Sequence, residues 1–204
     1  MPISKGEPWG TPGALPRHGV VVRSDQEARA VVTAARRAGE PVPPLGLLGG
    51  DLCRTLGGTG DEARLRSEDA VQLPVDLGAV LVDGRLHWFV AHLVARRGWW
   101  RGRVVAAMNA QYLGDWDVAP RGHPNDGRLD VLEADLPFDE RLQVRSRLKL
   151  GTHVPHPRID ERHQSAVQLD FERPTAVYLD GQRLDEPART LSIRVEADAL
   201  TCVV

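Results

Sequence analysis

The chain has 204 residues, of which 42% are apolar and 26% charged, and its formal net charge is −2. These values are ordinary for a globular protein, and they give no general electrostatic attraction for nucleic acid or an anionic membrane. No apolar run approaches the roughly 18 residues that a membrane-spanning helix needs, so we expect no transmembrane segment. The two cysteines, Cys53 and Cys202, argue against a disulfide framework and fit a reducing cytoplasm.

The first elements along the chain are a tail, a strand and a helix. Residues 1–18 contain several prolines and no apolar core, and we expect them to form a flexible tail. Residues 19–22 form a short apolar run that is typical of a buried strand. Ser24, with Glu27 three residues later, forms a capping box, and Gly39 marks the end of the helix that the box opens. Together these signals predict a β-α unit.

The pattern changes near residue 70. Before it, a further short helix is predicted at 51–56, and residues 19–69 form a reduced α/β segment. After it, Asp83-Gly84 between two strand-like runs is a strong hairpin signal. A helix is expected at 139–150. Residues 70–204 are otherwise strand-like, which predicts an α+β protein with a β-rich, sandwich-like C-terminal lobe. The expected strands are 75–82, 86–94, 104–113, 129–132, 166–171, 176–179, 191–195 and 200–204.

Several short motifs occur in an order that resembles one known family. Together they resemble the bacterial diacylglycerol kinases and related lipid kinases, which share a fold with the NAD kinases. The resemblance covers roughly residues 42–204 and rests on the order and spacing of the motifs. The motifs are the run 51–57, Val75-Asp76-Leu77-Gly78, Asn109-Ala110-Gln111-Tyr112-Leu113-Gly114, Ala119-Pro120, Asp126-Gly127-Arg128-Leu129-Asp130-Val131 and Leu179-Asp180-Gly181-Gln182.

The Asp180-Gly181-Gln182 turn is the catalytic position that the resemblance implies. The kinases of this family carry an acidic residue where this chain has Gln182. A carboxylate can accept the proton of the attacking lipid hydroxyl, whereas a carboxamide has no useful basicity, and general base catalysis contributes roughly 10²–10⁴-fold. Asp180 has two interpretations that both stay open: it is a substitute base, or it is simply the residue that forms the turn.

The nucleotide-binding positions implied by the resemblance are also altered. The family's first glycine-rich phosphate loop corresponds to residues 22–26, which contain no glycine. Its second loop corresponds to the stretch containing Gly49, Gly50 and Asp51, which lacks the family's Thr and Asn. Glycines allow backbone amides to approach phosphate closely, so we expect ATP binding to be impaired.

A metal site is implied in the loop before the Asp126 motif. By position, the ligands are a carboxylate from Asp126 and the backbone carbonyls of His123 and Arg128. Hard cations such as Mg²⁺ prefer oxygen ligands, and Mg²⁺ is therefore the expected cofactor. The alternative is a plain hairpin turn without metal.

A turn rich in Trp and Arg lies in the β-rich half. Trp99-Trp100 is flanked by Arg96, Arg97, Arg101 and Arg103. Such a turn suits peripheral contact with an anionic headgroup, and its alternative is a solvated hairpin tip.

These observations predict a degenerate diacylglycerol/lipid kinase-like protein. We expect it to bind a lipid or a small phosphorylated ligand without efficient phosphoryl transfer, and to bind no nucleic acid. The alternative is an active ATP-dependent lipid kinase with a remodelled nucleotide site. The sequence does not determine the oligomeric state.

Overall fold

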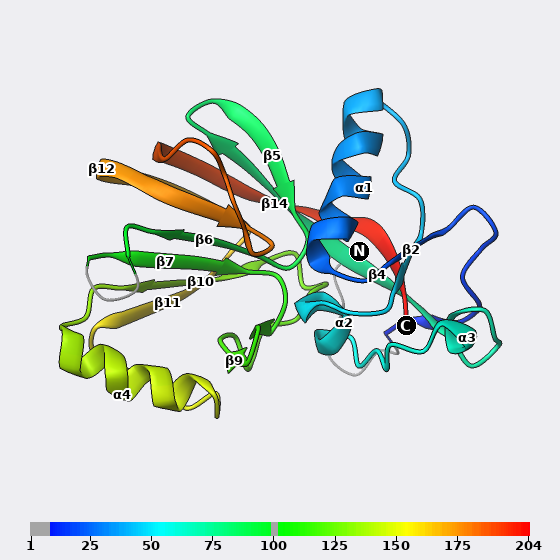
Figure 1. Cartoon of the computed structure of the whole chain (residues 1–204), viewed down its shortest axis with the longest axis horizontal. Coiled ribbons are helices and arrows are strands. Elements are labelled where there is room, and N and C mark those ends of the chain that lie inside the picture. Colours follow the sequence, from blue (N-terminus) through cyan, green and yellow to red (C-terminus); the bar gives the residue numbers. More distant parts are fainter. Residues whose placement is uncertain (1–8, 99–101) are drawn as a thin grey trace.

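The structure is a computed structural model that describes residues 9–98 and 102–204. The first eight residues of the expected tail, and Trp99, Trp100 and Arg101 of the expected membrane-contacting turn, lie outside the described residues. The chain forms a β sandwich with a smaller α/β unit beside it (Figure 1). The α+β prediction with a sandwich-like C-terminal part is therefore confirmed.

The structure describes the following elements in chain order. Short elements fill the N-terminal part: β1 (Thr11–Pro12), β2 (Val20–Val22), α1 (Asp25–Ala38), β3 (Leu45–Leu47), α2 (Asp51–Thr55) and α3 (Glu62–Leu65). The rest consists of strands of very different length and one helix: β4 (Val71–Val82), β5 (Arg85–Phe89), β6 (His92–Arg96), β7 (Val104–Met108), β8 (Tyr112–Leu113), β9 (Trp116–Asp117), β10 (Leu129–Ala134), α4 (Phe138–Leu148), β11 (Ile159–Gln164), β12 (Ala166–Leu179), β13 (Gln182–Arg183) and β14 (Ala188–Val203).

Helix α1 begins and ends where its capping residues predict. The Ser24 side chain accepts a hydrogen bond from the N–H of Glu27, and Gly39 closes the helix with a left-handed φ of 69°. The face of α1 that carries Ala28, Val32 and Ala35 is buried. The helix thus contributes one apolar stripe to the core of the N-terminal unit and keeps its polar side exposed.

The sandwich core forms between strands that are far apart in the sequence. Val80 of β4 and Ile193 of β14 pack in one buried cluster with Leu93 of β6, Val105 of β7 and Val131 of β10. The two layers are continuous because β12 pairs with β14 on one side and with β6 on the other. The order of the main path is β1-β4-β14-β12-β6-β7-β10-β11.

The N-terminal unit is part of the same hydrogen-bonded sheet. Strand β2 pairs in parallel with β3, and β3 pairs in parallel with the end of β14, where Leu45 lies opposite Cys202. The structure therefore contains a complete β-α-β unit, one strand more than the predicted β-α unit. This connection fixes the turns at the ends of β2 and β3 against the sandwich.

Two strand predictions were wrong in the same region. The expected strand at 86–94 is interrupted, because β5 ends at Phe89 and β6 begins at His92. The backbone N–H groups of Val90 and Ala91 donate to the carboxylate of Asp180 instead of to a neighbouring strand. The expected strand at 104–113 likewise ends at Met108, where the side chain of Asn109 donates to two backbone carbonyls.

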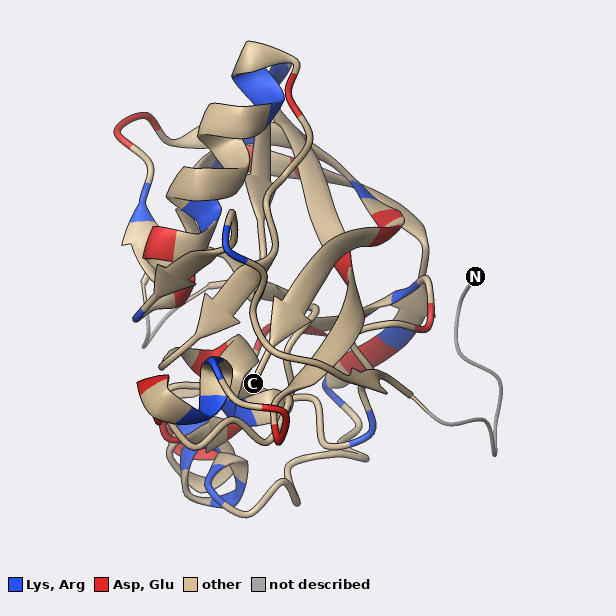
Figure 2. Cartoon of the chain, turned by 90° about the vertical axis from the view of Figure 1, so that its right-hand side faces the viewer, with Lys and Arg blue, Asp and Glu red and all other residues tan. Residues whose placement is uncertain are grey.

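Charges of both signs alternate over the outside of the molecule, and neither sign occupies a whole face in the view of Figure 2. No helix among residues 9–98 and 102–204 is both long enough and apolar enough to cross a bilayer.

Candidate functional site at the junction of the two halves

Asp180 lies at the centre of the candidate site. Its side chain is fully buried, and its two carboxylate oxygens accept hydrogen bonds from the N–H groups of Val90, Ala91 and His92 at 3.0, 2.8 and 3.1 Å. Asp180 itself has a left-handed φ of 48° at the start of the β12–β13 turn. Burial raises the pKa of this carboxyl to about 6, although the hydrogen bonds and the nearby His92 oppose the shift.

Helix α1 supplies the polar groups that face this turn. Nε of Arg29 lies 3.6 Å from Oδ2 of Asp180. The side-chain carbonyl of Gln182 accepts hydrogen bonds from Nε2 of Gln26, at 3.2 Å, and from the Arg29 guanidinium. The carboxamide at the family's acidic position is thus held by α1.

Asp51 and His92 form the second part of the site. Nε2 of His92 lies 3.0 Å from Oδ2 of Asp51, and the Asp51 carboxylate also accepts from the N–H of Gly114 at 3.0 Å. Burial alone would lower the pKa of His92, but the bond to Asp51 and the nearby Asp180 and Asp25 outweigh burial and raise it. Burial would raise the pKa of Asp51, but the bonds from His92 and Gly114, together with the charges of His92 and Arg54, outweigh burial and lower it.

Asp25 closes the site from the N-terminal unit. Its carboxylate accepts from the N–H groups of Asp51 and Leu52 at 2.6 and 3.1 Å, so it caps the first turn of α2. Burial is the main cause of its raised pKa. The capping requires close backbone approach: a Cβ built on Gly50, whose φ is 97°, would lie 2.5 Å from Oδ1 of Asp25, and one on Gly49 would lie 2.6 Å from a backbone carbonyl.

We call these five charged side chains the junction cluster: Asp25, Arg29, Asp51, His92 and Asp180. The structure brings the predicted Gly49, Gly50, Asp51, Asp180 and Gln182 to this one place. Asp25, Arg29 and His92 were not among the predicted site residues. The signal for Asp25 was present, since it follows a buried strand at the position of the family's first phosphate loop.

The predicted metal residues lie in a separate loop before β10. Oδ1 of Asp126 accepts from the N–H of Arg128 at 2.9 Å, and Nδ1 of His123 accepts from the N–H of Asn125 at 3.2 Å. The buried Asp76 accepts from the N–H of Gly127 at 2.7 Å and anchors the loop. Asp126 lies near two further carboxyl groups, those of Asp76 and Asp130. Burial, and then the negative charge of Asp126, raise the pKa values of both, that of Asp130 to about 6.

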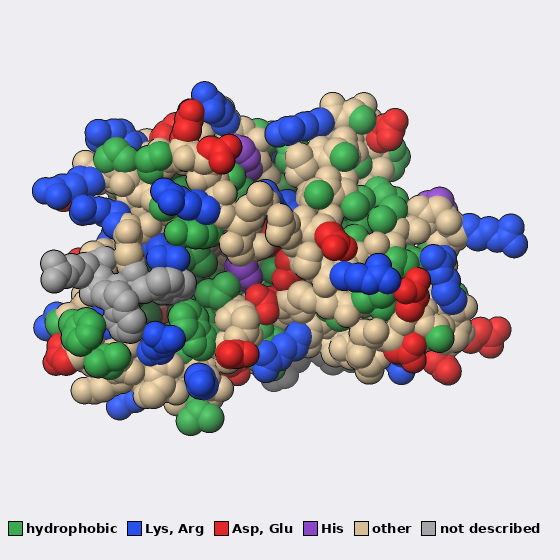
Figure 3. All heavy atoms as spheres, in the orientation of Figure 1, with side chains coloured by type: hydrophobic (Ala, Val, Ile, Leu, Met, Phe, Trp, Pro, Cys, Tyr) green, Lys and Arg blue, Asp and Glu red, His purple; other side chains and the backbone are tan. Residues whose placement is uncertain are grey.

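A cleft of about 450 Å³ opens beside the junction cluster. Arg96 lies over the ring of Tyr178, 4.5 Å from its centroid, and Arg145 lies over the ring of Trp116 at 5.8 Å. In Figure 3 a histidine and acidic side chains gather near the middle of the face that this view presents. The residues that line the cleft are His92, Val94, Arg96, Leu113, Gly114, Asp115, Trp116, Arg145, Lys149, Tyr178 and Gly181.

The fold and this arrangement of loops define an NAD kinase-like β-sandwich protein. The family described as the YegS C-terminal NAD kinase beta sandwich-like domain matches residues 78–204, more than half of the chain. The chain belongs to this family, and the predicted resemblance is confirmed. No curated protein matches the sequence.

Solved structures show the same fold at low sequence identity. A proposed diacylglycerol kinase from Bacillus anthracis strain Sterne is 15% identical, with a TM-score of 0.69 over 91% of this chain and 77% of that one. A diacylglycerol kinase from the same strain is 16% identical, with a TM-score of 0.59 over 91% and 75%. Yeast NADH kinase, solved with NADH, is 11% identical, with a TM-score of 0.54 over 92% and 61%. At these identities the similarity establishes the fold, and the chain spans about three fifths of the yeast kinase.

Proposed function

We propose that this protein is a degenerate lipid kinase-like protein that binds an anionic ligand, a lipid or a small phosphorylated molecule, in the cleft beside the junction cluster. Phosphoryl transfer is absent or strongly reduced. The observation that carries the proposal is the state of the two residues at the catalytic turn. Asp180 is buried with both oxygens bonded to backbone N–H groups, and Gln182 is a carboxamide held by α1.

Asp180 is a poor substitute base for steric and electronic reasons. Its side chain has no exposed surface, so a substrate hydroxyl has no place to lie against it. A base must come within hydrogen-bond distance of the proton that it removes. The geometry instead supports the other interpretation of Asp180, in which the residue forms the turn and binds the backbone between β5 and β6.

The nucleotide-binding loops also support weak ATP binding. At the start of a helix, free backbone N–H groups are the usual ligands of phosphate. Here the N–H groups of Asp51 and Leu52 at the start of α2 are already bonded to the Asp25 carboxylate. A phosphate would have to displace an anion from the same donors, and the negative charge of Asp25 and Asp51 would repel it.

The loop that contains Asp126 fits a hard cation. It offers a carboxylate, it is anchored by Asp76, and it lies close to a second acidic side chain, Asp130. Mg²⁺ bound there by Asp126 and the carbonyls of His123 and Arg128 would neutralise this charge and stabilise the loop. In this proposal the ion has a structural role and takes no part in the chemistry of the junction cluster.

An active, ATP-dependent lipid kinase with a remodelled nucleotide site is the second candidate function. The observation in its favour is the pair formed by His92 and Asp51, since a His–Asp pair on the wall of a cleft can serve as a general base. The raised pKa of His92 weakens this role, because only the neutral imidazole accepts a proton and the raised pKa lowers the neutral share at any given pH.

Phosphoryl transfer and binding are tested separately on the full chain. The first assay follows Mg²⁺-dependent ATP hydrolysis and phosphorylation of diacylglycerol, and we expect rates well below about 1 s⁻¹. The second follows the NMR spectrum during titration with ATP and Mg²⁺, and then with inorganic phosphate. We expect shifts with phosphate at cleft residues such as Arg96 and Lys149. Rapid product formation that is lost in His92→Gln would establish the kinase instead.

A further inference from the structure

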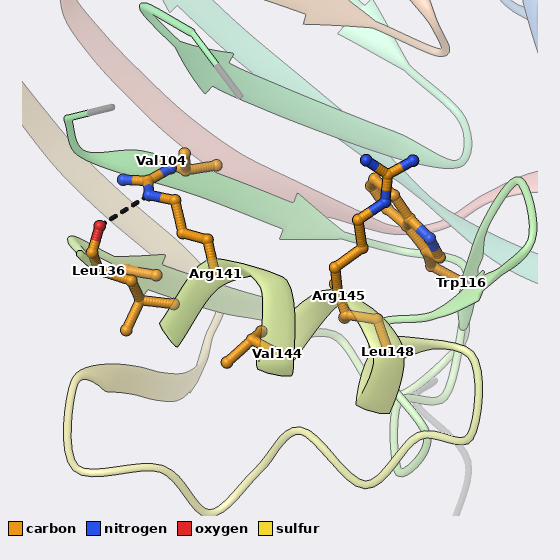
Figure 4. Close-up of a pocket in the computed structure, with 8 residues that line it drawn as sticks. Val104, Trp116, Leu136, Arg141, Val144, Arg145 and Leu148 are labelled. Carbon is orange, nitrogen blue, oxygen red and sulfur yellow. Dashed lines mark hydrogen bonds between the residues drawn. The ribbon is translucent and has the colours of Figure 1, made fainter. Parts of the chain in front are cut away.

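A second, apolar cavity of about 210 Å³ lies beneath helix α4. Val144 and Leu148 of α4 form one wall, and Val104 of β7 and Ala134 of β10 form the opposite wall (Figure 4). Apolar cavities of this kind bind apolar ligands, because water within them would find few hydrogen-bonding partners. This cavity shares two of its lining residues, Trp116 and Arg145, with the cleft beside the junction cluster.

The two ends of the apolar cavity differ in chemistry. At one end, the Arg141 side chain is buried and its Nε donates to the carbonyl of Leu136 at 2.7 Å, as the dashed line in Figure 4 shows. Its guanidinium also donates to the carbonyl of Gly102, so this charge is engaged by backbone oxygens. At the other end, Arg145 and Trp116 line both the apolar cavity and the cleft. The cavity and the cleft therefore adjoin at these two residues.

The cleft has an excess of positive charge where it meets the cavity. Arg96, Arg145 and Lys149 line it, against the single carboxylate of Asp115. The ring of Tyr178 gives it one flat apolar surface. His92 lies on its wall, and the Nδ1 of this side chain has no hydrogen-bond partner in the described part of the chain. Cationic side chains are suitable partners for an anionic head.

We propose that the apolar cavity beneath α4 and the adjoining cleft together bind a single-chain lipid with an anionic head, a phosphate or a carboxylate. The chain lies between α4 and strands β7 and β10, and the head lies among Arg96, Arg145 and Lys149. This inference rests on the proposed function and specifies its ligand. One chain is favoured over two because three further cavities in the described part of the chain are lined mainly by charged and polar side chains.

The test uses alkyl phosphates of increasing chain length and the full chain. Affinities for inorganic phosphate, butyl phosphate, octyl phosphate and dodecyl phosphate are measured by calorimetry at monomeric lipid concentrations. Each methylene that leaves water for the cavity should raise affinity by about fourfold, until the cavity is full and the gain stops. Dodecanoate compares the carboxylate with the phosphate, and dodecanol, which has no charge, should bind at least tenfold more weakly than either.

Matched variants separate the chain from the head. Ala134→Phe fills the cavity and should abolish the gain with chain length while inorganic phosphate binds as before. Leu148→Asn, which makes the wall polar, provides a second variant in case the first does not fold. Lys149→Gln should weaken binding by a similar factor at every chain length. Leu142 of α4 is 47% exposed and Leu150, in the turn after α4, is 75% exposed, and Leu142→Ser and Leu150→Ser should leave all affinities unchanged.

The outcomes distinguish this inference from the proposed function. If phosphate binds and Lys149→Gln weakens it, but longer chains add nothing, the proposed function stands and the α4 cavity is not a lipid site. If no anion binds, the proposed function itself fails. If the chain-length gain survives both Ala134→Phe and Leu148→Asn but is lost in Leu142→Ser, the chain adsorbs to the outer face of α4 and the inference is wrong.

Discussion

The imidazole Nε2 of His92 lies 3.0 Å from Oδ2 of Asp51, and this contact joins the β sandwich to the β-α-β unit across 41 positions of sequence. His92 begins β6, and Asp51 begins α2. Because both side chains are largely buried, the pair links the stability of the junction to the protonation state of one imidazole.

The first prediction concerns the pH dependence of this link. The pKa of His92 is raised in the folded protein, since the Asp51 bond and the charges of Asp180 and Asp25 outweigh burial. Its contribution to stability is therefore fully present below the unfolded value near 6.5 and is lost as pH rises through the folded pKa. We expect the difference in unfolding free energy between wild type and His92→Gln to shrink from pH 6 to pH 8. Denaturant unfolding at several pH values measures it, and a constant difference would contradict the raised pKa.

A second prediction separates structure from catalysis at Asp180. Asp180→Ala leaves three buried N–H groups and Arg29 without their acceptor, and we expect it to lower the unfolding free energy by at least about 3 kcal/mol. Asp180→Asn keeps one carbonyl oxygen and should cost less. Gln182→Ala, at the exposed neighbouring position, should change stability by less than about 1 kcal/mol. Chemical denaturation of the three variants measures this order, and equal stabilities for Asp180→Ala and Gln182→Ala would refute it.

Restoring the family's acidic residue should not restore kinase activity. In Gln182→Glu the new carboxylate would take the place of the amide oxygen beside Arg29 and form an ion pair with it. A base held by a guanidinium has a lowered pKa and accepts protons weakly. The first phosphate loop would still lack its glycines, and the second its Thr and Asn. We expect diacylglycerol phosphorylation by the variant to stay below about 1 s⁻¹. A large gain in the same assay would show that the lost carboxylate is the main defect.

The cation prediction depends on one carboxylate. Mg²⁺ or Ca²⁺ that binds the native Asp126 loop should raise the melting temperature, and above the dissociation constant the increase should grow with the logarithm of the cation concentration. Asp126→Asn keeps the size of the side chain and removes its charge, and we expect it to abolish the increase. Thermal melts with and without the cation measure the effect. An increase of the same size in the variant would place the ion elsewhere.

A matched pair of glycine variants tests the close approach at the start of α2. Gly50 and Gly57 both have left-handed φ angles, 97° and 77°, but a Cβ on Gly57 would meet nothing within 4 Å. Gly57→Ala should therefore cost only the backbone strain of about 1–2 kcal/mol. Gly50→Ala adds a clash with Asp25 and should cost about 1–3 kcal/mol more. Equal unfolding free energies for the two variants would mean that Asp25 can move away without loss.

Local signals in the sequence predicted most of the elements. The capping box at Ser24 and the Gly39 stop located α1 to the residue, and Asp83-Gly84 located the β4–β5 hairpin, whose φ angles of 46° and 84° suit that turn. The signals that failed were long-range. The break in the expected strand at 86–94 is set by Asp180, some ninety positions later, and no pattern within the strand announces it.

The sequence predicted those residues of the candidate site that belong to a short motif within one turn. Asp51, Asp180 and Gln182 were found because each lies next to a glycine: Asp51 and Gln182 follow one, and Asp180 precedes one. His92 was not found, since its partner, Asp51, is brought next to it only by tertiary packing. The apolar cavity beneath α4 depends on how a helix and two strands are placed in space, and the helical pattern alone indicated only that a helix forms there.

Strand β14 has a consequence for how the chain comes to be folded. Residues 188–203 are the shared partner of β3, β4 and β12, and they are synthesised after all three. Until they leave the ribosome, each of those strands has an open edge where β14 will later pair, and the pairings with β3 and β4 join segments that are more than 100 residues apart. Such topologies fold slowly and are prone to aggregate while incomplete. We therefore expect the incomplete chain to be most prone to aggregate before β14 is synthesised, because this one strand pairs with β3, β4 and β12.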